Sequence, residues 1–415
     1  MKKFIKNNII SILLLAISIF SLFIGFILNE DLSTGGAQWD FNLTWPIIIN
    51  YTDLNFSTDI TRHMPLHYFL MSLLNGIFND QNFIRILYLL LSFLFPFFLY
   101  LNLTKIYNYK KDILIIFSSS FLLIPLFRAS AIWPNAHLTA IIFFLIGNYF
   151  YLKSKETNTF VYKIINLLFL SFAIYCIQTY LLLFLYYLYK YFSSEKLKNF
   201  IKLFLFSSLL SLPGFLFIIL NPRIVGFGDI ITRDLYYTLS SNFSLIFFFF
   251  IFLLLNKKNL SIVVNEIKNF KNFEIFIVIL ITFFVFYFQE FFALDPRLRG
   301  GGFFYKLSYL ILNNNLIFII SALLGLIVSY ILIKYDQNFF YAILIMNLMS
   351  LNFIVYQKYF EPLFLIMIAV LFKNFLINNI LSSLKNALFF YILIFIYFII
   401  AYINYVNKIS FNLVL

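Results

Sequence analysis

Residues 1–31 read MKKFIKNNIISILLLAISIFSLFIGFILNED and decide the class of fold. Lysines precede an apolar run of about 20 residues, the length that crosses a hydrocarbon layer about 30 Å thick as an α-helix. No small-residue cleavage pattern precedes Asn29, so we expect a retained anchor and not a cleaved signal peptide. Because lysines collect on the cytoplasmic side of membranes, we expect a cytoplasmic N-terminus, with Glu30 and Asp31 just beyond the outer surface.

The composition extends this conclusion to the whole chain. Of its 415 residues, 63% are hydrophobic and 11% are charged, and the mean hydropathy is +0.93. Soluble domains carry about 25% charged and about 45–50% apolar residues, so a soluble enzyme is excluded. The single cysteine, Cys176, excludes an internal disulfide and a cysteine-based zinc cluster.

The apolar runs predict an all-α, polytopic integral membrane protein with about 13 transmembrane helices, since only helices satisfy every backbone polar group of a single segment in lipid. We expect an N-terminal module at 1–220, which includes a long first outer loop at 29–82 with short interfacial helices. Variable helices at 221–415 would follow, with outer loops at 221–238 and 295–315. The predicted spans are residues 9–28, 83–103, 113–128, 137–152, 160–176, 178–192, 200–220, 239–256, 273–293, 316–334, 338–356, 362–378 and 387–406.

The two kinds of basic residue separate across this topology. Almost all lysines fall on the predicted inner side, so the net charge of +13 is a topological signal and no nucleic-acid partner is expected. Arginine binds phosphate and carboxylate oxygens in a bidentate manner, which lysine cannot do, and this favours an outer reaction chamber. Loop solubility and ordinary ion pairs are the alternative. The arginines at the outer side or outer span ends are Arg62, Arg85, Arg128, Arg223, Arg233, Arg297 and Arg299.

The first outer loop concentrates the candidate chemistry. It opens with the carboxylates Glu30 and Asp31, a pair that suits general-base work, although a solvated helix end would look the same. His63 and His67 are four residues apart, which allows metal binding, but Pro65 separates them and no third ligand follows. We therefore assign no certain cofactor. A divalent metal stays an alternative that no ligand motif supports, and we favour hydrogen bonding or headgroup contact for the histidines.

The order of these features resembles that of the polytopic GT-C glycosyltransferases, the group of the protein O-mannosyltransferases and the lipid A aminoarabinose transferase. Glu30 or Asp31 stands at the place of the family's catalytic acid, directly outside the first span. Residues 65–68, PLHY, resemble the family's H-P-P-L-Y-Y segment. Residues 357–363, QKYFEPL, resemble its late R-Y-x-x-P element, with Lys358 in place of arginine. Residues 133–151 resemble its outer hairpin and fourth span.

The resemblance implies a membrane glycosyltransferase that moves a monosaccharide from a polyprenyl-phosphate donor to a glycan, lipid or protein acceptor. The reaction would take place on the periplasmic face of a bacterial inner membrane, in the assembly of cell-envelope glycans. Asp31 or Glu30 would be the catalytic base, and positive groups would stabilise the departing lipid phosphate. The phosphate-binding candidates are Arg62, His63, Arg297, Arg299 and Lys358. The substrate-pocket candidates are Asp40, Asp59, His67, Tyr68, His137, Glu290, Tyr359 and Glu361.

Two other classes of function remain open. A flippase or transporter for a lipid-linked glycan would use the outer arginines for pyrophosphate, but it would also need ionisable groups near the bilayer midplane, which the predicted spans nearly lack. A polysaccharide polymerase or ligase would place its chemistry in a long loop late in the chain. A structural membrane scaffold without enzymatic activity is a further alternative. His137 suits hairpin packing or a pocket, and Gly300–Gly302 suits a phosphate-binding turn or a flexible loop.

Overall fold

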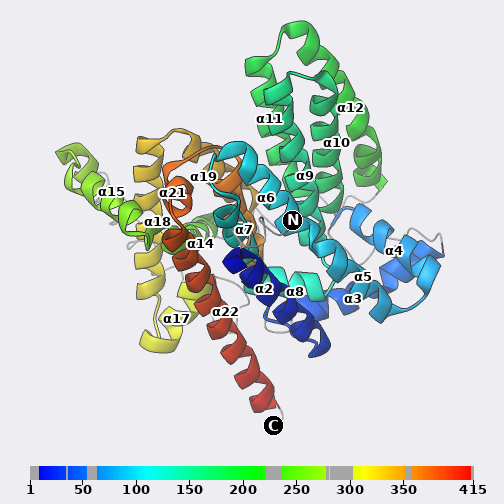
Figure 1. Cartoon of the computed structure of the whole chain (residues 1–415), viewed down its shortest axis with the longest axis horizontal. Coiled ribbons are helices and arrows are strands. Elements are labelled where there is room, and N and C mark those ends of the chain that lie inside the picture. Colours follow the sequence, from blue (N-terminus) through cyan, green and yellow to red (C-terminus); the bar gives the residue numbers. More distant parts are fainter. Residues whose placement is uncertain are drawn as a thin grey trace. The chain divides into compact units, whose positions relative to one another are not determined.

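The computed structural model describes residues 9–33, 36–53, 63–220, 235–276, 280, 302–350 and 357–412. Within these ranges the chain is built from α-helices and short 3-10 turns, without a β-strand (Figure 1). The all-helical prediction is therefore confirmed for the described part of the chain. Most of the predicted span 273–293, and most of the loops predicted at 221–238 and 295–315, lie outside the described residues.

The chain divides into two compact units. The first comprises Met1–Gly226 and Ala387–Leu415, and the second comprises Phe227–Asn386. The first boundary lies close to the predicted division at residue 220. The last helix, however, belongs to the first unit, whereas the sequence placed it with the C-terminal helices. Contacts that join residues more than 370 positions apart are responsible.

The helices of the first unit follow one another with short connections. The first backbone N–H groups of a helix have no partner within it, and polar side chains at the helix start accept their hydrogen bonds. The Asp80 carboxylate accepts from the backbone N–H groups of Asn82 and Phe83 and so begins one helix; Asn135 begins another by accepting from His137 N. In order they are α2 (Ile9–Ile27), α3 (Gly36–Thr52), α4 (Leu66–Phe78), α5 (Gln81–Ser92), α6 (Leu94–Ile106), α7 (Lys111–Ser120), α8 (Pro125–Ile132), α9 (Ala136–Thr157), α10 (Phe160–Cys176), α11 (Leu181–Ser194), α12 (Leu197–Leu220) and the returning α22 (Leu384–Asn412).

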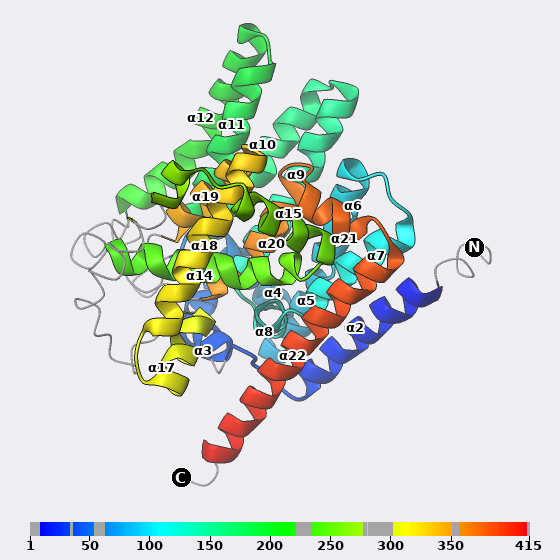
Figure 2. The same ribbon diagram turned by 90° about the vertical axis from the view of Figure 1, so that its left-hand side faces the viewer.

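Helix α22 packs beside α2, α7 and α8 (Figure 2). The Tyr391 hydroxyl lies 2.7 Å from Ser18 Oγ, and the ring of Phe390 stacks on Phe117 with centroids 4.9 Å apart. Apolar burial and one shared hydroxyl pair thus join the two ends of the chain, which explains why the first unit includes both.

A second group of helices in this unit, α6, α9, α10 and α11, is joined by buried amides. Asn148 Nδ2 donates to Asn102 Oδ1 at 2.8 Å, and Asn166 Nδ2 donates to the carbonyl oxygen of Gly147 at 2.8 Å. In an apolar environment such groups are stable only when they are hydrogen-bonded, so they fix which helix faces meet.

The second unit is described from α14 onward. Its α14 and α18 cross closely at Gly325, where an added Cβ would lie 2.0 Å from the carbonyl oxygen of Phe243. Ser244 Oγ and Ser321 Oγ share a hydrogen bond of 2.7 Å at the same crossing. The helices are α14 (Leu235–Leu254), α15 (Lys257–Lys268), α17 (Gly302–Leu312), α18 (Leu316–Tyr335), α19 (Asn338–Met349), α20 (Leu363–Val370) and α21 (Phe375–Leu381).

The described helices include six that are long and apolar enough to cross a membrane, or up to eight if two bent pairs each count as one span. The chain is therefore a membrane protein by the length and composition of its helices, and the expected total of about 13 spans remains a prediction. The bent pairs fall on predicted spans 113–128 and 362–378, where the helices turn by 68° and 88°. The six are Ile9–Ile27, Gln81–Ile106, Ala136–Thr157, Leu197–Leu220, Leu316–Tyr335 and Leu384–Asn407.

Candidate functional site

Glu30 forms a buried ion pair with Arg128 of α8. Arg128 Nε lies 2.7 Å from Glu30 Oε1 and Nη2 lies 3.0 Å from Oε2, so the guanidinium holds both carboxylate oxygens. The remaining donors reach Ser21 on α2, through its hydroxyl at 3.0 Å and its carbonyl at 2.9 Å. Only 1% of the Arg128 side chain and 2% of the Glu30 side chain are exposed. The pair therefore ties the end of α2 to α8, and its charges are compensated inside the protein.

Gly25 leaves the space that this pair occupies. A Cβ at that position would lie 2.7 Å from Glu30 Oε2 and 2.8 Å from Arg128 Nη2. The backbone of Glu30 also bonds back to the helix, since its N–H donates to the Gly25 carbonyl at 2.8 Å. The chain leaving α2 thus turns tightly enough to return the carboxylate over its own last turn.

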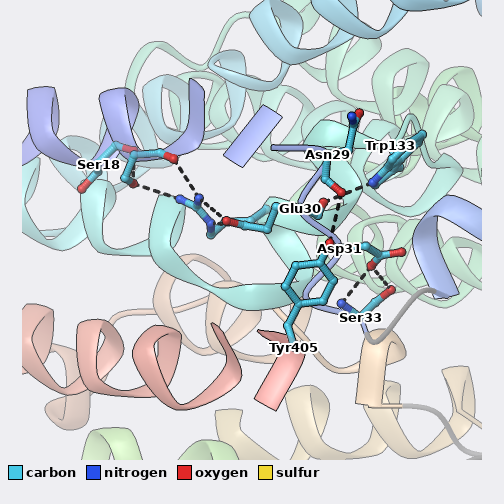
Figure 3. A network of polar contacts seen from close by, with 9 residues as sticks. Ser18, Asn29, Glu30, Asp31, Ser33, Trp133 and Tyr405 are labelled. Carbon is cyan, nitrogen blue, oxygen red and sulfur yellow. Dashed lines mark hydrogen bonds and ion pairs between the residues drawn. The ribbon is translucent and has the colours of Figure 1, made fainter. Parts of the chain in front are cut away.

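Asp31 organises the start of α3. Its Oδ1 accepts from the backbone N–H of Ser33 at 3.0 Å and from the Ser33 hydroxyl at 2.5 Å, and its Oδ2 accepts from Gln38 N at 2.8 Å. Ser33 Oγ in turn accepts from Ala37 N at 2.7 Å. Figure 3 shows Glu30 and Asp31 side by side with their carboxylates engaged by different partners. Asp31 is buried, and its carboxyl group lies against the N-terminal turn of a helix, where backbone N–H groups need acceptors.

The hairpin between α8 and α9 joins the acidic pair to the rest of the site. Trp133 Nε1 donates to the carbonyl oxygen of Glu30 at 3.1 Å (Figure 3). The Arg85 guanidinium lies 3.7 Å from the centroid of the Trp133 ring, and its Nη2 donates to Asn29 Oδ1 at 2.9 Å. The Trp133 ring is therefore held between a cation and the chain that carries both acids.

Four residues beyond Trp133, the same hairpin meets the histidines of the first loop. The rings of His137 and His63 make an edge contact with centroids 5.4 Å apart. His67 Nδ1 lies 2.9 Å from Thr139 Oγ1, which also lies 2.9 Å from the Tyr88 hydroxyl. These groups come from α4 and the residues just before it, from α5, and from the start of α9. They form one polar cluster, which we call the histidine cluster: His63, His67, Tyr68, Tyr88, His137 and Thr139.

The environment of the cluster sets which of its members carry charge. Burial, and to a lesser extent the neighbouring His63, together lower the pKa of His67 to about 3, so the His67 ring is neutral at physiological pH. Burial raises the pKa of Tyr68, and the negative charge of Asp40 adds to the rise. A neutral imidazole and a protonated phenol are hydrogen-bonding groups, and they suit the recognition of a polar, uncharged ligand group.

The structure brings Asp40, His63, His67, Tyr68 and His137 into this one region, together with the acidic pair through Trp133. Because α4 begins only at Leu66, His63 lies before the helix and does not share a helical face with His67. Among the residues that the structure describes, no group of three histidine, cysteine, aspartate or glutamate side chains is placed to hold a metal ion.

The remaining predicted residues belong to the second unit or lie outside the described residues. Lys358, Tyr359 and Glu361 belong to the second unit, where buried Glu361 accepts a hydrogen bond of 3.0 Å from Gln357 Nε2. The others lie outside the described residues: Asp59, Arg62, Glu290, Arg297 and Arg299.

Sequence reasoning missed four members of the site. It placed Arg128 and Arg85 at outer span ends without assigning them partners, and it assigned no role to Tyr88 or Thr139. An arginine inside an apolar run was the available signal, because such a charge needs a partner. The identity of that partner depends on a contact across 98 residues, which no local pattern contains.

Comparisons of the whole chain with protein-family models, with characterised protein sequences and with solved structures find no match.

Proposed function

We propose that this chain is an integral membrane glycosyltransferase that moves a monosaccharide from a polyprenyl-phosphate donor to an acceptor on the outer, periplasmic face of a bacterial inner membrane. One observation supports it above the others. The carboxylates that follow the first span, and the histidines that close the first loop, meet on one hairpin through Trp133 and His137. Groups suited to proton transfer and to sugar recognition therefore share one end of a membrane unit.

The contacts of the two carboxylates favour different roles. Both oxygens of Glu30 already accept hydrogen bonds from one guanidinium, so this carboxylate is engaged by a structural partner. We assign it to positioning the chain after α2. Asp31 Oδ2 accepts only one of the hydrogen bonds described, from Gln38 N, so a lone pair remains to take the proton of an acceptor hydroxyl. We assign Asp31 as the base.

The departing phosphate needs positive donors as its charge develops. His63 and His137, in edge contact beside neutral His67, are the candidates of the first unit. Arg62, Arg297, Arg299 and Lys358 remain candidates from the sequence. Neutral His67 and Tyr68 would hydrogen-bond the sugar. The lipid tail of the donor would lie along apolar helices, so this reaction requires no nucleotide site.

The test is sugar transfer from a polyprenyl-phosphate donor by the purified chain in nanodiscs. Asp31→Asn keeps a good helix-capping side chain but removes the base, so we expect transfer to fall by about 10²–10⁴-fold with normal protein levels. Asp80→Asn is the matched control, because Asp80 caps α5 in a similar way away from the cluster, and it should keep full activity.

Glu30→Gln separates the two roles. We expect it to reduce stability more than catalysis per folded molecule, because Arg128 loses its charged partner. Transfer that survives in both Asp31→Asn and Glu30→Gln would refute the proposed mechanism. Loss of transfer in Asp80→Asn as well would show that capping, and not proton transfer, explains the Asp31 effect.

A further inference from the structure

Helix α15 (Lys257–Lys268) has an apolar stripe that nothing in the described part of the second unit covers. Leu260, Val264 and Ile267 are 48%, 38% and 45% exposed. They follow one another at spacings of four and three residues, so they line one face of the helix. A continuous exposed stripe of this kind marks a surface that meets an apolar partner.

The side of α15 next to this stripe is held rigidly in the unit. Asn259 is fully buried and donates through Nδ2 to the carbonyl oxygens of Leu253 at 2.8 Å and Leu376 at 3.0 Å. Its Oδ1 accepts from Asn379 Nδ2 at 2.8 Å. With Val263 buried beside it, the helix cannot roll to hide its apolar stripe.

Lysines border the stripe. With about 3.6 residues per turn, Lys257 and Lys268 fall next to Val264 on the side away from the packed face, and Glu266 falls almost opposite Val264. Lys258 and Lys271 are also exposed. The nearby acid Glu274 is already bound by Lys334 Nζ at 2.7 Å. The exposed surface of α15 and its following turn therefore carries an excess of positive charge.

The end of α18, a helix long and apolar enough to cross a membrane, indicates how deep in the membrane the surface of α15 lies. Helix α18 (Leu316–Tyr335) ends in Tyr330, Lys334 and Tyr335, and tyrosine and lysine at the end of an apolar helix are typical of a membrane–water interface. The segment after α15 packs there, since the Phe270 ring contacts Tyr330 and Glu274 bonds Tyr330 OH at 2.7 Å. The stripe is thus placed at the boundary between lipid tails and headgroups.

We propose that α15 is an interfacial helix that binds the anionic phospholipids of the membrane leaflet at this end of the second unit. Leu260, Val264 and Ile267 insert among the upper acyl chains, while the lysines bind headgroup phosphates. The apolar stripe is complementary to the acyl chains of such a surface, and the bordering lysines are complementary to its anionic headgroups. This lipid surface is separate from the histidine cluster and does not depend on the glycosyltransferase proposal.

Depth is tested with the full chain in nanodiscs made with lipids brominated in the upper acyl chain. Cys176→Ala removes the only native thiol, and a fluorophore is then placed at Val264→Cys or, as the matched control on the same helix, at Glu266→Cys. We expect strong bromine quenching at position 264 and little at 266. Equal quenching at both positions, or none at 264 because an acidic protein or solvent covers the stripe, overturns the proposal.

The preference for anionic headgroups is tested by native mass spectrometry. The protein is released from nanodiscs that contain equal amounts of phosphatidylglycerol and phosphatidylcholine, and the lipids that stay bound to it are counted. The variant with Lys257, Lys258, Lys268 and Lys271 each changed to Gln should lose its preference for phosphatidylglycerol, with a fall in affinity of about fivefold per lysine. The matched variant with the same four changed to Arg should retain the preference. An unchanged preference in the Gln variant also overturns the proposal.

Discussion

The Glu30–Arg128 pair makes a strong prediction about stability. Arg128→Met keeps an apolar stem of similar length but leaves the Glu30 carboxylate buried without its partner. Removing one member of a buried ion pair typically lowers the free energy of unfolding by about 3–5 kcal/mol, because the remaining charge is desolvated and uncompensated. Replacing both members by apolar residues removes that penalty, so Glu30→Leu with Arg128→Met should regain about 2 kcal/mol or more over Arg128→Met alone.

The measurement is unfolding of the purified chain in mixed detergent micelles by titration with a denaturing detergent. The matched control is Lys105→Met, which breaks a 2.6 Å ion pair with Glu156 whose side chains are 29% and 46% exposed. Exposed pairs contribute about 0–1 kcal/mol, so this variant should resemble the wild type. A loss of stability in Arg128→Met no larger than in Lys105→Met, or a double variant as unstable as Arg128→Met, would show that the buried ion pair does not act in this way.

Three further outcomes follow from the packing. The lowered pKa of His67 means that its neutral form is favoured in the folded state. Its contribution to the free energy of unfolding is therefore present above pH 6.5 and is lost as the pH falls toward about 3, by about 1.4 kcal/mol per pH unit. His67→Gln should flatten this slope in unfolding titrations between about pH 7.5 and 5. Gly325→Ala should disrupt the α14–α18 crossing and lower the thermal unfolding temperature, because its Cβ would meet the Phe243 carbonyl at 2.0 Å, whereas Gly76→Ala, with its nearest neighbour at 3.7 Å, should be tolerated. Asn102→Leu should cost about 1–2 kcal/mol by removing the acceptor of a buried amide, and solvent-denaturation midpoints that match the wild type would contradict this.

The positions of the helices were predictable because each apolar run carries its own signal. Predicted spans 9–28 and 316–334 match α2 and α18 to within one residue at each end. Predicted span 137–152 starts within one residue of α9 but ends five residues before it. The bends were not predictable in the same way. Span 113–128 breaks where α7 ends at Ser120 and α8 begins at Pro125, and whether such a break bends a helix depends on what packs against it.

The candidate site was partly predictable for a related reason. The first loop places Asp31, Asp40, His63 and His67 close in sequence, so their clustering required only a compact loop. The contribution of the 133–137 hairpin required a contact with the first loop across some seventy residues or more, and it was suggested only by resemblance to the GT-C family.

The sequence by itself determined that this chain is helical and membrane-embedded, because hydrophobicity and backbone hydrogen bonding in lipid act within each segment. It also predicts that lysines and arginines lie on opposite sides of the membrane, and this separation stays a prediction. Only the tertiary structure decided that Glu30 is paired with Arg128 while Asp31 begins α3, and that Tyr391 returns the last helix to the first. Those choices depend on which buried charges and hydroxyls meet in three dimensions, and burial of an unpaired polar group is what makes them specific.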